Sequence, residues 1–76
     1  MKEILFISET SFAEPIMMRD EMDYYLYNYK DNDSGENITK KLPIEEYLIN
    51  DKKYLIIKES KLITPERIEY EISNFY

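Results

Sequence analysis

The stretch Ile4-Leu5-Phe6-Ile7, close to the N-terminus, is an unbroken run of apolar side chains that is followed by polar residues. A short apolar run bounded by polar residues is typical of a buried strand. We therefore expect residues 3–8 to form a buried strand that opens the domain. A second run, Tyr54-Leu55-Ile56-Ile57, lies between two lysines and predicts a central strand.

Tyrosines crowd the segment between these two runs. Because tyrosine favours extended structure, residues 22–30 are predicted to form a strand. A helix within residues 15–29 is the alternative, since apolar side chains there also recur at helical spacing. The only glycine of the chain, Gly35, lies in the polar stretch that follows, where a positive φ would close a turn. We therefore expect residues 22–30 to pair with residues 37–42 in an antiparallel hairpin.

Prolines bear on two further segments. Residues 9–15 are predicted to be a loop, because Pro15 disfavours the helical conformation at the residue before it. Pro43 and the two acids that follow it are typical of a helix start, so we expect a short helix over residues 44–49. The alternative is a hairpin arm that ends in a two-residue Asn50-Asp51 turn.

The C-terminal segment has the clearest helical pattern. Thr64-Pro65-Glu66 combines an N-cap, a proline at the first helical position and an acid in the first turn. Ile68, Ile72 and Phe75 follow on one helical face. The whole sequence therefore predicts an α+β fold, with one compact domain over residues 1–76. In it, a C-terminal amphipathic helix packs on one face of a small antiparallel sheet of three to four strands.

The chain of 76 residues contains no cysteine and no histidine, so it lacks the thiol nucleophile, the commonest general base and the commonest transition-metal ligand. The acidic stretch that begins at Asp31 resembles a calcium loop in composition. However, Gly35 falls one place early and Leu42 stands where the bidentate glutamate belongs. We expect no enzymatic activity, no cofactor and no metal site.

The N-terminal apolar run is too short for a signal peptide or a membrane span, so we expect a cytoplasmic protein with no membrane partner. Abundant lysine and isoleucine and the absence of valine are typical of an AT-rich genome. A low-GC bacterium, or a phage living in one, fits this usage.

Acids outnumber bases 16 to 10, and the net charge of −6 disfavours direct binding to nucleic acid and favours a basic protein surface. Two acidic i, i+2 pairs lie at residues 21 and 23 and at residues 31 and 33. In a strand, such carboxylates lie roughly 7 Å apart on one face, a spacing comparable to that of successive phosphates. Three tyrosines at alternate positions share one face of the predicted strand, as interface anchors or as filling at the core edge. The predicted partner-binding residues are Glu14, Asp20, Glu21, Asp23, Tyr25, Tyr27, Tyr29, Asp31, Asp33 and Glu36.

These features predict a non-enzymatic acidic inhibitor from a phage or mobile element, of the anti-CRISPR or another anti-defence type. It would occlude the basic nucleic-acid-binding surface of its target by imitating nucleic acid. One alternative is an immunity protein or antitoxin that neutralises a basic toxin. Another is a small homodimeric accessory subunit, such as an RNA polymerase factor.

Overall fold

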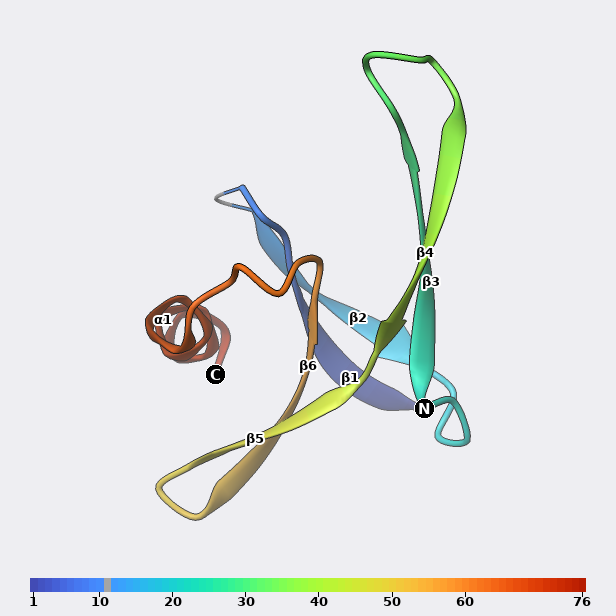
Figure 1. Cartoon of the computed structure of the whole chain (residues 1–76). Coiled ribbons are helices and arrows are strands. Elements are labelled where there is room, and N and C mark those ends of the chain that lie inside the picture. Colours follow the sequence, from blue (N-terminus) through green and yellow to red (C-terminus); the bar gives the residue numbers. More distant parts are fainter. Residues whose placement is uncertain (11) are drawn as a thin grey trace.

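The computed structural model describes residues 1–10 and 12–76 (Figure 1). Strands make up 51% of the chain and helix 15%, so the fold is mostly sheet. The elements in chain order are β1 (Lys2–Ile7), β2 (Ala13–Met18), β3 (Tyr24–Lys30), β4 (Asn37–Pro43), β5 (Glu45–Ile49), β6 (Lys52–Lys58) and α1 (Pro65–Phe75).

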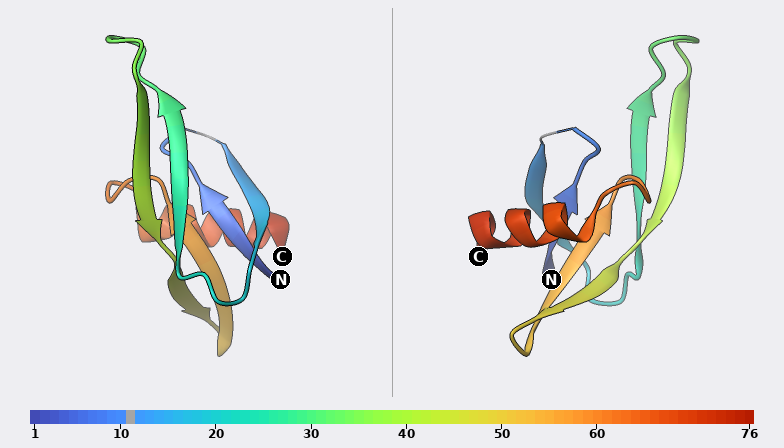
Figure 2. Two further views of the ribbon diagram at one scale, coloured as in Figure 1. Left: turned by 90° about the vertical axis from the view of Figure 1, so that its right-hand side faces the viewer. Right: turned by 60° about the vertical axis from the view of Figure 1, so that its left-hand side comes forward.

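The strands form two sheets rather than one. Four strands pair in the order β2-β1-β6-β5, while β3 and β4 form a separate two-stranded sheet. The central pair, β1 and β6, runs parallel, with Leu5 beside Ile56. The predicted α+β fold with a single antiparallel sheet is therefore wrong. The hairpin that we expected to extend the sheet instead covers the face opposite α1 (Figure 2).

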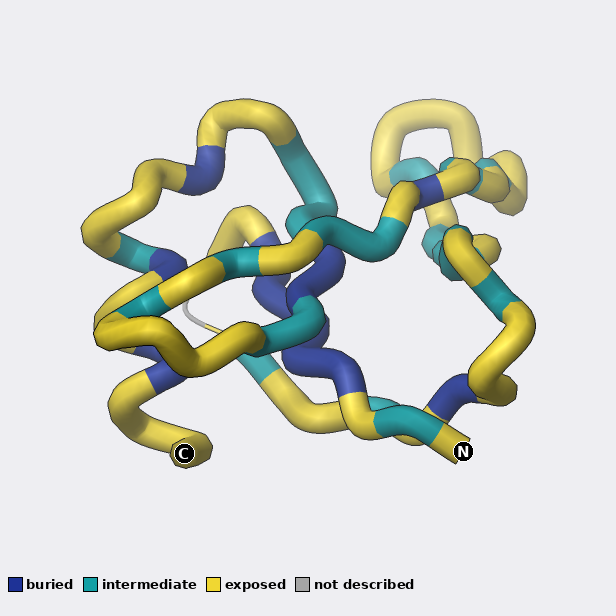
Figure 3. Tube along the Cα trace, turned by 90° about the horizontal axis from the view of Figure 1, so that it is seen from below, coloured by how far each residue is buried: buried dark blue, intermediate teal, exposed yellow. Residues whose placement is uncertain are grey.

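The reason lies in the apolar run of β1. Successive side chains of a strand point to opposite faces, so this run needs apolar partners on both sides of the sheet. Leu5 and Ile7 belong to the cluster under α1, whereas Ile4 and Phe6 belong to the cluster under the β3–β4 hairpin. All four side chains are at most 4% exposed. In Figure 3 the buried residues gather along the central strands, and the chain ends and turns are exposed.

Strand β2 corrects the predicted loop over residues 9–15, because the strand begins at Ala13 and contains Pro15. The amide of Ser8 donates to the carbonyl of Phe12, which makes these two residues a hydrogen-bonded pair of the antiparallel β1–β2 ladder. From this pair on, hydrogen-bonded and non-hydrogen-bonded pairs alternate along the ladder. Pro15 faces Leu5 in a non-hydrogen-bonded pair, where an N–H would point away from β1. Since β2 is an edge strand, a proline at this position costs no ladder bond and blocks pairing with a further strand.

The β3–β4 hairpin confirms the predicted antiparallel pairing of the tyrosine-rich segment with residues 37–42. The helical alternative for residues 24–29 is thereby excluded. Gly35 has a φ of +73°, as the turn prediction requires. The loop between β2 and β3 occupies residues 19–23, so the strand begins two residues later than expected.

The predicted helix over residues 44–49 is wrong, and the alternative hairpin is confirmed. Tyr47 pairs with Tyr54, and the two turn residues Asn50 and Asp51 have φ values of 50° and 66°. Asparagine and aspartate tolerate this left-handed conformation, which a two-residue hairpin turn requires. The apolar pattern follows a period of two, because Tyr47 and Ile49 pack against the cluster under α1.

Helix α1 confirms the predicted C-terminal element. The Thr64 hydroxyl accepts a hydrogen bond of 3.2 Å from the Arg67 amide, and Pro65 is the first helical residue. Ile68 and Ile72 are each 3% exposed, whereas Phe75 is 42% exposed and lies at the edge of the packed face. The helix therefore covers the sheet through its two isoleucines.

Replacing Phe6 with alanine tests the two-sided burial of β1. We expect a loss of about 3–5 kcal/mol in the free energy of unfolding, because the substitution leaves a cavity in the cluster under the hairpin. Phe12→Ala is the matched control: Phe12 is 50% exposed, and its loss should cost less than about 1 kcal/mol. Urea denaturation followed by circular dichroism measures both values. Equal losses in the two variants would contradict the assignment of the core.

Candidate functional site

The β3–β4 hairpin is anchored at its base and projects at its tip (Figure 1). At the base, the Phe6 ring contacts Tyr25 edge-on, with centroids 5.9 Å apart, and Tyr27 at 5.1 Å. Further along, Tyr29 stacks on Tyr27 at 5.7 Å but lies outside the two core clusters of the described residues. The hairpin is therefore an arm whose far half extends beyond the body of the protein.

The turn at the tip of this arm has a defined hydrogen-bond network. The Asp31 carboxylate accepts from the Asp33 amide at 3.2 Å and from the Ser34 hydroxyl at 2.9 Å. The Gly35 amide donates to the Asp31 carbonyl at 2.8 Å, and the Asp31 amide donates to the Glu36 carbonyl at 2.9 Å. Asp31 thus holds the turn, and Asp33 and Glu36 take part in none of the ion pairs found within residues 1–10 and 12–76. We call the three carboxylates of Asp31, Asp33 and Glu36 the acidic tip.

The acids of the β2–β3 loop lie at the other end of β3 and are partly neutralised. Asp20 forms an ion pair of 3.5 Å with the N-terminal amino group, and Glu21 lies 3.8 Å from Arg19. The Lys2 ammonium donates to two carbonyls of this loop, those of Asp20 and Met22. All three acids of the loop are exposed. Asp20 and Glu21 each have a cation beside them, whereas Asp23 takes part in none of the ion pairs of the described residues.

The structure does not bring the predicted acids onto one face. Glu21 and Asp23 lie in a loop, and Asp31 and Asp33 lie in a turn, so neither pair has the strand spacing on which the phosphate comparison rested. The seven residues of β3, at about 3.4 Å each, separate the two groups by roughly 24 Å. Glu14 lies on β2, opposite Phe6 in the ladder. Only the three carboxylates of the acidic tip form a group that projects from the protein.

The predicted tyrosine anchors divide in the same way. All three tyrosines are half-buried, but Tyr25 and Tyr27 pack against the protein's own cluster under the hairpin, whereas Tyr29 does not belong to it. Burial, together with the charge of Glu59, raises the pKa of Tyr27, so its hydroxyl is protonated at neutral pH. Tyr29 is thus the anchor that lies furthest out along the arm.

Lysines on β4 were not among the predicted site residues. The Lys40 ammonium lies 5.2 Å from the centre of the Tyr29 ring, and the Lys41 ammonium lies 4.4 Å from that of Tyr24. Such cation–π contacts align long side chains along the arm. The expected pairing of residues 22–30 with residues 37–42 could have predicted these contacts, because it places two lysines across from a run of tyrosines.

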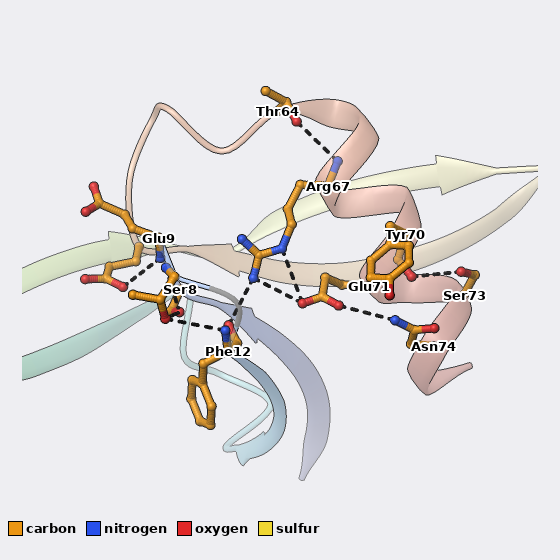
Figure 4. Close-up of polar contacts among 11 residues, drawn as sticks. Ser8, Glu9, Phe12, Thr64, Arg67, Tyr70, Glu71, Ser73 and Asn74 are labelled. Carbon is orange, nitrogen blue, oxygen red and sulfur yellow. Dashed lines mark hydrogen bonds and ion pairs between the residues drawn. The ribbon is translucent and has the colours of Figure 1, made fainter.

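A groove between α1 and the β1–β2 turn has a volume of about 710 Å³, with Tyr70 and Phe75 on its helical wall. Figure 4 shows the polar contacts of this region. Arg67 spans this region: its guanidinium donates to Glu71 Oε2 at 3.3 and 3.1 Å and to the Phe12 carbonyl at 3.2 Å. Glu71 is only 5% exposed and also lies 3.5 Å from the Asn74 amide nitrogen. The pair clamps α1 to the β1–β2 turn, and both of its residues also line the groove.

Chemically reactive groups are scarce over residues 1–10 and 12–76. No group of histidine, cysteine or acidic residues there could hold a metal ion, and no buried side-chain polar atom lacks a hydrogen-bond partner. Partial burial and the nearby Glu3 carboxylate raise the pKa of Tyr76 to about 12, and burial also raises the pKa of Tyr47. These shifts favour the neutral phenol, which is the opposite of what a tyrosine nucleophile or base requires.

No family model matches this sequence, and neither a curated protein nor a solved structure shows significant similarity to it. In the part of the chain that the structure describes, no helix has the length and apolar character needed to cross a bilayer.

Truncating Glu71 tests the clamp. We expect Glu71→Ala to lower the free energy of unfolding by about 3 kcal/mol, because it leaves the Arg67 guanidinium half-buried without its partner. Glu46→Ala is the matched control, since the exposed pair that it breaks with Lys53 should be worth less than about 1 kcal/mol. Denaturant titration of both variants measures the difference. A loss in Glu71→Ala no larger than that in the control would show that the clamp is not stabilising.

Proposed function

We propose that this protein is a non-enzymatic inhibitor that inserts its β3–β4 arm into a basic groove of a nucleic-acid-handling protein. The observation that carries the proposal is the acidic tip, which projects from the body and is held in one shape by hydrogen bonds from Asp31. A preformed turn loses little conformational entropy on binding. Its charge of −3 lies where a basic groove would meet it first.

The shape of the molecule supports the same proposal. Its principal extents are 44, 28 and 17 Å, and the long axis includes the projecting arm. An arm of this kind can enter a groove that the body of the protein does not fit. Tyr29 and the exposed Leu26 would follow the tip and bury apolar area against the walls of the groove.

The proposal places the protein in the bacterial cytoplasm, where anti-defence inhibitors of phages meet nucleases and other nucleic-acid-binding targets. An immunity protein that plugs the basic active site of a toxin would use the same arm. The two functions differ in the target that the arm binds, which is a host defence protein in one case and a toxin in the other.

Reversing the two free charges of the tip tests this function. We expect the tagged protein to retain a nucleic-acid-binding protein from a low-GC bacterial lysate at about 0.1 M salt and to release it at about 0.5 M, because salt screens exposed charges. Asp33→Lys with Glu36→Lys should abolish retention, because it places positive charges against the basic groove. The turn should keep its shape, since the carboxylates of Asp33 and Glu36 make none of the hydrogen bonds through which Asp31 holds it. Glu66→Lys with Glu69→Lys on α1 changes the net charge equally and should leave retention intact.

Unchanged retention by the tip variant would contradict the proposal. So would a retained target that still binds its nucleic acid while the protein is attached. A toxin as the retained target would favour the immunity function.

A further inference from the structure

We propose that two copies of this chain associate through the outer edge of β4, so that each acidic tip lies in a lysine-lined groove at the base of the other copy's arm. The inference does not rest on the inhibitory function, and it concerns a different set of contacts.

The backbone of β4 shows which edge is free. The Asp31 amide donates to the Glu36 carbonyl, and the Ile44 amide donates to the Asp23 carbonyl. Hydrogen-bonded pairs of an antiparallel ladder recur at every second residue, so the even-numbered residues of β4 bond to β3. Thr39 and Lys41 therefore point their N–H and C=O groups away from β3. Among the described residues no strand pairs with this edge.

The two ends of this edge carry opposite charges. At one end is the acidic tip. At the other, a groove of about 520 Å³ lies between the base of β4 and residues 58–61. Its charged lining consists of three lysines and two glutamates, Lys41, Lys58, Lys61, Glu45 and Glu59, so it is positive by one charge. Lys58 pairs with Glu45 at 3.4 Å, whereas Lys41 and Lys61 take part in none of the ion pairs of the described residues.

Antiparallel pairing of β4 with a second β4 matches these charges twice. The two-fold axis passes near Thr39, and each copy's tip then reaches the base of the other copy's arm, where Lys41 and Lys61 lie. Such an interface is isologous, because both copies use the same surface, and it joins the two hairpins into one four-stranded sheet.

Two of the other edges, those of β2 and β3, are poorer candidates for self-pairing. Pro15 removes the central donor from the outer edge of β2. Strand β3 has acids at both ends, in the loop before it and in the turn after it, so antiparallel self-pairing along β3 would bring like charges together. The edge of β4 combines free backbone groups with ends of opposite sign.

Sedimentation of the purified chain alone tests the inference, at concentrations up to about 1 mM, where weak association is populated. We expect a monomer–dimer equilibrium that weakens with salt. Lys41→Glu with Lys61→Glu should weaken the dimer by about tenfold or more, because each copy then places like charges at both contacts. Lys52→Glu with Lys53→Glu, at the β5–β6 turn, gives the same net charge and should weaken it much less.

A rescue makes the assignment specific. Adding Asp33→Lys and Glu36→Lys to the Lys41→Glu and Lys61→Glu variant exchanges the charges of tip and groove and restores the wild-type net charge, so dimerisation should return. Thr39→Pro, with folding checked by circular dichroism, should abolish the dimer because it removes an outward N–H and spares the β3 ladder. A wild-type monomer at every concentration and salt would overturn the proposal, as would a dimer that the exchange fails to restore.

Because the dimer and the inhibitory complex would both use the acidic tip, they would exclude each other. The sedimentation experiment contains no target, so its result stands whether or not the inhibitory function is correct.

Discussion

Four consecutive apolar side chains of β1 require a cover on each side of the sheet. Helix α1 supplies one cover and the β3–β4 hairpin supplies the other, and the parallel neighbour β6 completes the buried centre. The clusters on the two faces share no side chain but are joined through the backbone of β1, where Leu5 faces the helix and Phe6 faces the hairpin. With 76 residues, no disulfide and no metal group in its described part, the protein depends on this two-sided burial for its stability.

The covering role of the hairpin also explains its exposure. Only its base, around Tyr25, Tyr27 and Leu42, is needed to close the cluster over Phe6. The strands continue beyond that contact, so their far half carries Tyr29 and the acidic tip away from the body. A single element thus completes the core at one end and presents a charged turn at the other, which is the arrangement from which both proposals start.

Local patterns in the sequence were sufficient where a short-range interaction decides the structure. The Thr64 N-cap, the positive φ of Gly35 and the strand expected over residues 3–8 all depend on neighbours in the chain, and all three were predicted. The helix expected over residues 44–49 failed because its rival depends on pairing with β6 and on the left-handed turn at Asn50 and Asp51. The prediction of a single antiparallel sheet was wrong for a related reason. An apolar run shows that both faces of a strand are buried, but not whether a helix or a separate hairpin covers each face. The site was harder still: the acids looked alike in the sequence, and only the fold separates the free tip from the loop acids that lie beside the N-terminus and Arg19.

Hydrogen exchange of the backbone amides under native conditions tests the two-sided burial most directly. The account predicts that the central amides of β1 and β6 exchange only through global unfolding, because both faces of these strands are covered, whereas amides from Tyr29 to Ile38 exchange far faster through local opening of the arm. Protection that extends undiminished to the tip of the hairpin, or fast exchange in β1, would contradict it.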